Sequence, residues 1–168
     1  MNESILPALK IAFLFGFTLH NLEEAIWLPG WSRFAGRFRQ PVSRRRFIFA
    51  VTVVTVVGYG LTAAEFLAGG SSPALHYIYL GFIGMMGVNA ILPHLLATVV
   101  LKRYMPGLAT GLVLNLPLSA FIIYESVRRG ADPLIVLAAV IINSGITVLL
   151  LRMLFEQGTQ VHVGRGEQ

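Results

Sequence analysis

The sequence predicts an all-α integral membrane protein, a bundle of five transmembrane helices with its N-terminus outside and its C-terminus in the cytoplasm. Of the 168 residues, 55% are hydrophobic and only 12% are charged, about half the charged share of a typical soluble domain. Five apolar runs are each long enough to cross a bilayer, which takes about 20 residues. The chain has no cysteine, so disulfides, thiolate metal sites and a cysteine nucleophile are excluded.

The apolar runs follow one another with short connections, apart from the arginine-rich connection between the first and the second. The runs are Ile5–Leu28, Phe47–Ala68, Ala74–Leu101, Gly107–Val127 and Pro133–Phe155. Their valine content would favour strands in water, but in lipid a helix satisfies its own backbone hydrogen bonds. We expect residues 1–156 to form one five-helix transmembrane domain and residues 157–168 to form a disordered cytoplasmic tail.

The distribution of Lys and Arg predicts the orientation of the bundle. A basic connection joins the first two runs, and it lies on the same side as the Lys102–Arg103 turn and the tail. The connection holds Arg33, Arg37, Arg39, Arg44, Arg45 and Arg46. The opposite side has fewer basic residues, so the arginine-rich side is predicted to be cytoplasmic. Topology and contact with membrane lipids explain the net charge of +5, and nucleic acid is not expected as a partner. The expected location is the plasma (inner) membrane of a prokaryote.

Ionisable residues cluster late in the first apolar run. His20, Glu23 and Glu24 are spaced i, i+3 and i+4, so a helix places them on one face. A charged group at the centre of a bilayer costs roughly 2.5–3.5 kcal/mol or more, and such residues usually face the protein interior and serve a function. The sequence therefore predicts an internal site on this face.

Polar residues of three other runs are predicted at a similar depth. These residues are Asn89, His94, Asn115 and Asn143. With a rise of 1.5 Å per residue, the carboxylates and His94 fall about 10 Å from the midplane and the asparagines within roughly 3 Å of it. Glu65, His76 and Glu125 are expected near the opposite surface, where we interpret them as interfacial. Pro93 and Pro117 each lack an N–H group, and the resulting kinks would expose backbone carbonyls beside the polar layer.

The chain resembles the HXXEE-domain membrane proteins, and its copy of the motif is His20-Asn21-Leu22-Glu23-Glu24. Gly111-Leu112-Val113-Leu114-Asn115 matches a G-x-x-x-N motif of that family. Asn89 and His94 resemble its N-x-x-x-H motif, with four intervening residues in place of three. This spacing sets the two side chains about 140° apart on a regular helix, so only a distorted helix could aim both inward. The segment from Arg103 to Thr110 also resembles the family, whose motifs imply an enzyme without naming a reaction.

The first hypothesis for the site is a metal-dependent membrane enzyme, a hydrolase or an oxidoreductase. His20, His94 and one of the two glutamates, Glu23 or Glu24, would hold one divalent ion, Zn²⁺ or Fe²⁺. The other glutamate would act as general base toward an activated water, so Glu23, Glu24 and Asn115 are the candidate catalytic residues. Asn89 and Asn143 would orient ligands or substrate. The depth of the site favours an apolar or lipid-like substrate, such as a lipid, quinone or isoprenoid.

Two other classes of function use the same residues. A metal-free intramembrane hydrolase would activate water with a glutamate and a histidine. Its residue types are similar to those of CAAX-type glutamate proteases, although Leu28 occupies the position where that family has Arg. A proton- or ion-coupled carrier also uses buried carboxylates and histidines, and a five-helix chain without an internal repeat would then assemble as a homo-oligomer. A buried Glu–His pair that only joins two helices is the structural alternative.

Overall fold

The computed structural model describes residues 5–34 and 43–156, which form five long helical rods. The first, second and last rods are single helices, and the third and fourth contain interruptions. The elements are α1 (Ile5–Phe34), α2 (Arg44–Ala68), α3 (Pro73–Asn89), η2 (Ala90–Leu95), α4 (Leu96–Leu101), α5 (Leu108–Thr110), η3 (Gly111–Asn115), α6 (Leu116–Arg128) and α7 (Pro133–Glu156). The predicted tail and part of the arginine-rich connection lie outside the described residues.

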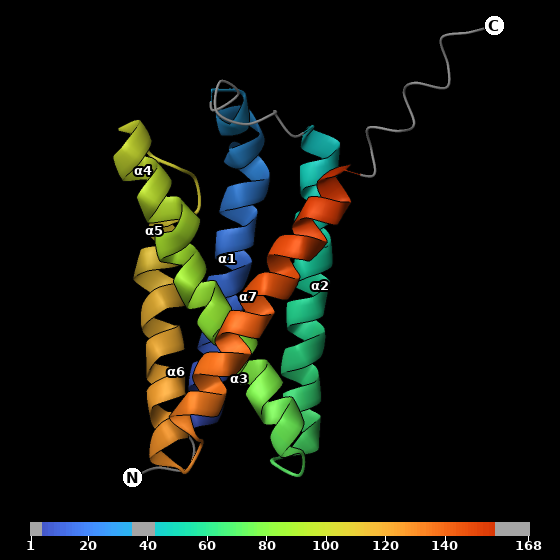
Figure 1. The fold of residues 1–168 in the computed structure, drawn as a ribbon, viewed down its shortest axis with the longest axis vertical. Helices are drawn as coiled ribbons and strands as arrows, with labels where there is room; N and C mark the ends of the chain where they lie inside the picture. Colours follow the sequence, from blue (N-terminus) through green and yellow to red (C-terminus); the bar gives the residue numbers. More distant parts are fainter. Residues whose placement is uncertain (1–4, 35–42, 157–168) are drawn as a thin grey trace, which may run out of the picture.

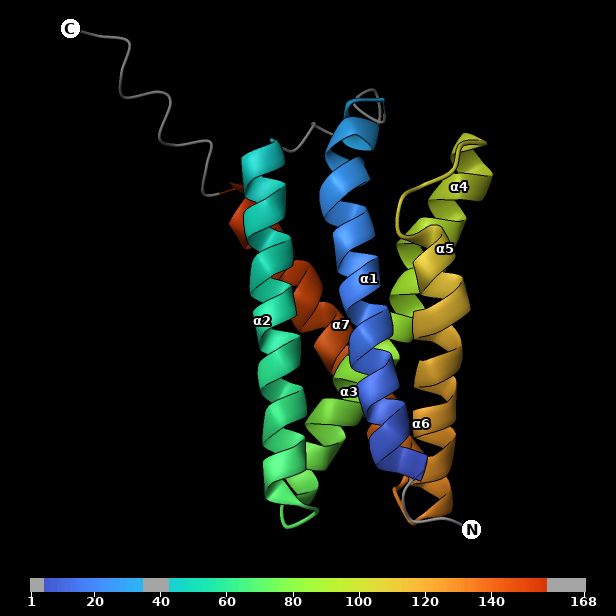
Figure 2. The same ribbon diagram turned by 180° about the vertical axis from the view of Figure 1, so that it is seen from behind.

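The rods run in alternating directions along one bundle axis (Figures 1 and 2). One end, the lower end in Figure 1, holds the start of α1, the turn between α2 and α3, and the turn between α6 and α7. The other end, the upper end, holds the end of α1, the start of α2, and the connection between α4 and α5. The antiparallel order agrees with the order expected from five successive spans. The structure does not show which end faces the cytoplasm.

Short side chains and polar caps set the helix boundaries. Ser43 accepts a hydrogen bond from the backbone N–H of Arg46 at the start of α2, and Ser72 accepts one from Leu75 at the start of α3. Gly69 ends α2 with a φ of 53°, a left-handed conformation that glycine adopts at little cost. The predicted boundaries agree to within a few residues, except that α1 continues through Pro29 to Phe34.

The middle of α3 forms the centre of the bundle. Every residue from Tyr79 to Gly87 is buried, and the aromatic rings of Phe13 and Phe17 on α1 pack edge-on against Phe82 of this segment. A Cβ on Gly81 would lie 2.5 Å from Asn143 Nδ2 and 2.7 Å from the Ala139 carbonyl oxygen. Glycine therefore lets α7 approach α3 closely, and α7 crosses the front of the bundle obliquely (Figure 1).

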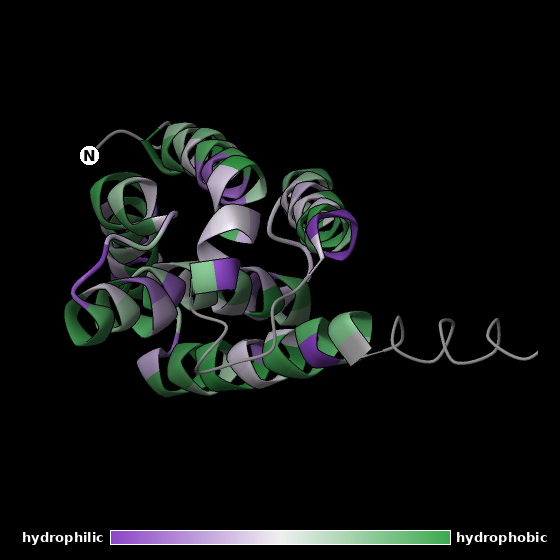
Figure 3. Cartoon of the chain, turned by 90° about the horizontal axis from the view of Figure 1, so that it is seen from above, coloured by the Kyte–Doolittle hydropathy of each residue, from purple (hydrophilic) through white to green (hydrophobic). Residues whose placement is uncertain are grey.

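The outer surface of the bundle is apolar. Large exposed side chains include Phe15, Leu67, Val113, Leu134 and Val148, each at least 65% exposed, and Figure 3 shows hydrophobic residues on every helix of the bundle. All five rods are long and apolar enough to cross a membrane. Such a surface would be unfavourable in water, and the described residues form an all-helical bundle whose five rods could each span a membrane.

Two rods are irregular beside the predicted polar layer. η2 contains Pro93 and has Leu92 in a non-helical conformation, with φ −121° and ψ 106°, and η3 directly precedes Pro117. Widened turns of this π type occur frequently at functional sites. The chain between Asn89 and His94 therefore has the distortion that both side chains would need in order to face inward, and this distortion determines where His94 points.

Candidate functional site

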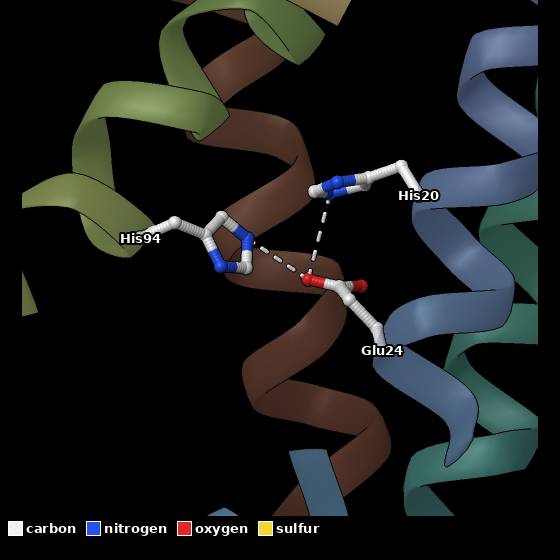
Figure 4. A group of neighbouring side chains, drawn as sticks. All are labelled: His20, Glu24 and His94. Carbon is white, nitrogen blue, oxygen red and sulfur yellow. Dashed lines mark ion pairs between the residues drawn. The ribbon is translucent and has the colours of Figure 1, made fainter. Parts of the chain in front are cut away.

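Three side chains from α1 and η2 point toward one another (Figure 4). Glu24 Oε1 lies 3.6 Å from His20 Nε2 and 2.9 Å from His94 Nε2. Both histidines are buried, and Glu24 is 15% exposed. One potential ligand atom from each residue lies within 4.8 Å of the other two. We call His20, Glu24 and His94 the His–Glu–His group.

Helical spacing and the irregular segment together build this group. His20 and Glu24 are four residues apart on α1, so they share one face. His94 arrives from η2, and the widened turn allows His94 and Asn89 to face the same point. Asn89 Nδ2 lies 3.2 Å from His20 Nε2 and 3.2 Å from His94 Nε2. The amide can donate to a ring nitrogen that carries a lone pair, so with both rings in the Nδ1–H tautomer the two Nε2 atoms are acceptors directed into the group.

Glu23 does not join this group, although it is next to Glu24 in the sequence. Its carboxylate accepts hydrogen bonds from the Tyr104 hydroxyl (2.5 Å), the Thr110 hydroxyl (2.7 Å) and the Thr110 backbone N–H (3.4 Å). Tyr104 in turn accepts from Ala109 N (3.1 Å). Desolvation and then the hydrogen bond to Glu23 raise the pKa of the Tyr104 phenol, so it remains a donor at neutral pH. Glu23 thus links α1 to the connection between α4 and α5 through Tyr104 and to α5 through Thr110.

Thr110 connects Glu23 to His20. The Thr110 hydroxyl lies 2.7 Å from Glu23 Oε2 and 3.2 Å from His20 Nδ1. Its single proton is donated to the carboxylate, so the hydroxyl oxygen accepts from His20 Nδ1–H. This places the His20 lone pair on Nε2, toward Glu24 and His94. A hydrogen bond to the second ring nitrogen is how proteins commonly orient metal-ligating histidines.

Gly107 forms the wall of the site between the two imidazole rings. A Cβ at this position would lie 2.5 Å from His94 Cε1 and 3.0 Å from His20 Cε1. The backbone of Gly107 also has a φ of 95°, a region that side chains other than glycine rarely adopt. Both the space and the conformation therefore require glycine here.

A pocket of about 240 Å³ adjoins the group on the side of α2 and α7. Glu24 and Asn89 contribute polar atoms to its wall, and most of the remaining wall is apolar. The lining includes Leu28, Trp31, Val51, Val54, Met85, Met86, Met105, Leu151 and Phe155. Asn21 also lines the pocket and donates to Thr55 Oγ1 at 2.9 Å. An apolar molecule in this pocket would reach Glu24 and Asn89.

Two of the sequence-predicted asparagines are placed away from the group. Asn143 donates to the Ala139 carbonyl at 2.9 Å and faces Gly81, two turns of α3 before Asn89. Equal depth did not bring Asn143 to the group, because α7 crosses α3 obliquely. Asn115 is fully buried against Gly16 of α1, and neither amide atom has a hydrogen-bond partner among the described residues.

The residues interpreted as interfacial lie at the lower end, but two of them are buried. Glu65 is 5% exposed and Glu125 is 7% exposed. Glu65 pairs with Lys10 at 2.6 Å and with His76 at 2.7 Å, and these partners make burial tolerable. The two glutamates thus lie near the helix ends where the sequence places them, and their neighbours bury them there.

The sequence reasoning missed three residues of the site: Tyr104, Gly107 and Thr110. All three lie in the segment from Arg103 to Thr110, which resembled the family but received no role. The signal that could have identified them is the connection itself, because a short polar connection at the depth of a buried site contributes backbone and hydroxyl groups.

Comparison with known proteins places these residues within a family. A family model described as "Protein of unknown function with HXXEE motif" matches residues 11–122, a range that contains the whole His–Glu–His group. The uncharacterized protein YrkK of Bacillus subtilis (strain 168) is 46% identical over 153 residues, which cover 89% of this chain and 94% of that protein. No solved structure matches the chain. The chain therefore belongs to the family of proteins of unknown function with an HXXEE motif.

Proposed function

We propose that this protein is a membrane-embedded, metal-dependent enzyme that acts on an apolar or lipid-like substrate in the plasma membrane of a bacterium. The observation that carries the proposal is the convergence of His20 Nε2, Glu24 Oε1 and His94 Nε2 at one edge of an apolar pocket. The five candidate spans and the bacterial relative support the location.

The donor set fits one divalent ion. Two imidazole nitrogens and one carboxylate are a ligand set found for catalytic Zn²⁺ and for non-haem Fe²⁺. Ligand atoms bound at 2.0–2.1 Å to a tetrahedral ion lie about 3.4 Å apart, and the observed separations of 2.9 and 3.6 Å lie on either side of this value. Three acceptor atoms at this distance repel one another unless a proton or a metal ion lies between them. A bound ion would supply Lewis acidity in a hydrolase or redox chemistry in an oxidoreductase.

The surrounding residues have separate tasks in this proposal. Glu23 and Thr110 orient His20, and Gly107 leaves room for both imidazole rings. Asn89 lies on the pocket side, where it faces the part of the substrate that reacts. The apolar part of the substrate occupies the pocket between α1, α2, α3 and α7, so the bond to be broken or oxidised meets Glu24 and Asn89. This arrangement assigns Glu23 to positioning rather than to proton transfer, because both of its oxygens are already hydrogen-bonded.

A metal-free hydrolase is the second candidate, and one distance favours it. Glu24 Oε1 and His94 Nε2 are 2.9 Å apart, within the range of a charge-assisted hydrogen bond. This pair could remove a proton from water without an ion. The amide of Asn89 would then stabilise the developing negative charge on a substrate oxygen.

The interior of the bundle argues against a carrier. Phe13, Phe17 and Phe82 lie between the His–Glu–His group and the polar residues at the lower end. All three are at most 3% exposed, with the Phe17 and Phe82 ring centroids 5.4 Å apart. Proton or ion transfer through the bundle needs polar groups or water along the path, and this aromatic layer supplies none between α1 and α3.

Metal analysis of the purified protein tests the proposal. After loading with Zn²⁺, and separately with Fe²⁺ under reducing conditions, we expect one ion per chain by elemental mass spectrometry. His20→Ala, Glu24→Gln and His94→Ala should each lose the ion, whereas His76→Ala should retain it because His76 pairs with Glu65 at the lower end. Correctly folded protein that binds neither ion after loading would overturn the metal site. Hydrolysis that persists in a chelator and is lost in Glu24→Gln would establish the metal-free candidate instead.

A further inference from the structure

A second pocket, of about 540 Å³, lies at the lower end of the bundle. It is separated from the His–Glu–His group by the aromatic layer, and Lys10 and Glu24 are about 21 Å apart along α1 at 1.5 Å per residue. The lower pocket is lined by Lys10, Glu65, His76, Tyr77, Ser126 and Arg129 together with apolar residues. Its polar residues have no role in the function proposed above.

We propose that the lower pocket binds an anionic phosphate group, carried either by a membrane phospholipid or by free phosphate. The charges of the lining favour an anion. Lys10 and Arg129 contribute two permanent positive charges, while Glu65 contributes the one carboxylate among the lining residues. One oxygen of Glu65 accepts from both Lys10 Nζ and His76 Nδ1. The Lys10 ammonium, which has three N–H donors, therefore keeps donors beyond its bond to Glu65.

Other lining residues hold unused hydrogen-bond donors. Ser126 is 2% exposed, and its hydroxyl has no hydrogen-bond partner among the described residues. The Tyr77 hydroxyl accepts from Asp132 N at 2.8 Å, which leaves its own proton to donate. Arg129 Nε lies 3.9 Å from Glu125 Oε2, beyond hydrogen-bond distance. A buried hydroxyl without a partner is costly, so a ligand that accepts from Ser126 would recover this cost.

The apolar part of the lining favours an amphipathic carrier. Leu6, Pro7 and Phe66 lie in the same pocket as the donors, at an end of the bundle where a lipid head group would be located. Phosphate oxygens accept several hydrogen bonds at once, and arginine binds them in a bidentate geometry. Basic pockets between transmembrane helices bind phospholipid head groups in this way.

Ligand binding by the full-length wild type and three variants, each purified in a neutral detergent, tests the proposal. Phosphatidylglycerol binding is counted by native mass spectrometry, with diacylglycerol as a probe that keeps the acyl chains and lacks phosphate. Inorganic phosphate binding is measured by equilibrium dialysis with a radiolabel. The proteins are the wild type, Arg129→Gln, Ser126→Ala and the control Arg128→Gln, which removes a neighbouring arginine that does not line the pocket.

We expect saturable binding that weakens roughly tenfold in Arg129→Gln and in Ser126→Ala and is unchanged in Arg128→Gln. Binding of phosphatidylglycerol but not diacylglycerol or free phosphate identifies a lipid head group, and binding of inorganic phosphate identifies free phosphate. Ser126→Ala removes a hydroxyl without a partner, so its thermal stability without ligand should match the wild type. The absence of saturable binding to either probe, or equal weakening in Arg128→Gln, would overturn the proposal.

Discussion

Replacing Gly107 by alanine should weaken Zn²⁺ binding at least tenfold, whereas the same change at Gly130 should leave Zn²⁺ binding unchanged. Both glycines have positive φ, 95° and 105°, so a Cβ costs roughly 1–2 kcal/mol of backbone strain at either position. At Gly130 the new Cβ meets nothing within 4 Å, whereas at Gly107 it would lie 2.5 Å from His94 Cε1 and 3.0 Å from His20 Cε1.

The magnitude follows from the distance that the ring must move. Ordinary contact begins at 3.4 Å, so His94 must retreat by about 0.9 Å from its 2.5 Å approach to the new Cβ. Metal–ligand distances tolerate about 0.2 Å, so this displacement removes His94 from the ligand set. We expect at least a tenfold to hundredfold loss of affinity for Zn²⁺, similar to the loss of a supporting hydrogen bond or larger.

The assay is competition for Zn²⁺ with a chromophoric chelator, together with thermal unfolding of each variant. Gly130→Ala should bind Zn²⁺ as the wild type does and show only the loss in stability that comes from strain. If Gly107→Ala binds Zn²⁺ as tightly as Gly130→Ala, the imidazole rings of His20 and His94 are not held at a fixed distance from the backbone of Gly107. That result would refute the described geometry of the site.

Three further predictions concern the hydrogen bond that orients His20, the helix packing at a glycine, and a buried ion pair. Thr110→Val keeps the shape of the side chain but removes the bridge to the imidazole, so Zn²⁺ affinity should fall about 10–100-fold with one ion still bound at saturation; Thr110→Ser should restore it. Gly58→Ala should lower the melting temperature, because its Cβ would lie 2.6 Å from the nearest ring carbon, whereas Gly60→Ala, which meets nothing within 4 Å, should raise stability by about 0.5–1 kcal/mol. Lys10→Met or Glu65→Gln alone should destabilise the fold by up to about 3–5 kcal/mol and the double variant by less; chemical unfolding of the three proteins would contradict this if the two effects simply add.

The five spans, their approximate bounds and the pairing of His20 with a glutamate on the same face of one helix were accessible from the sequence because each depends on local rules. Length and hydropathy define the spans, and the i, i+4 spacing places His20 and Glu24 together. The position of Asn143 was not accessible, because it depends on the angle at which α7 crosses α3, and that angle is set by glycines on the other helix. The partner of Glu65 was missed although a lone Lys10 in the first span was a visible signal.

The division of labour between Glu23 and Glu24 follows from the geometry of one helical turn. Successive residues on a helix point about 100° apart, so the two carboxylates cannot both face the group that contains His94. Glu24, four residues after His20, points inward to His94, while Glu23 points toward Thr110 on the fourth rod. The Thr110 hydroxyl accepts a hydrogen bond from His20 Nδ1 and donates one to Glu23. Glu23 therefore lies outside the His–Glu–His group but orients His20 through this hydroxyl. Two adjacent glutamates after a histidine thus provide a ligand and the support for another ligand, and Glu23→Gln should weaken metal binding whereas Glu24→Gln should abolish it.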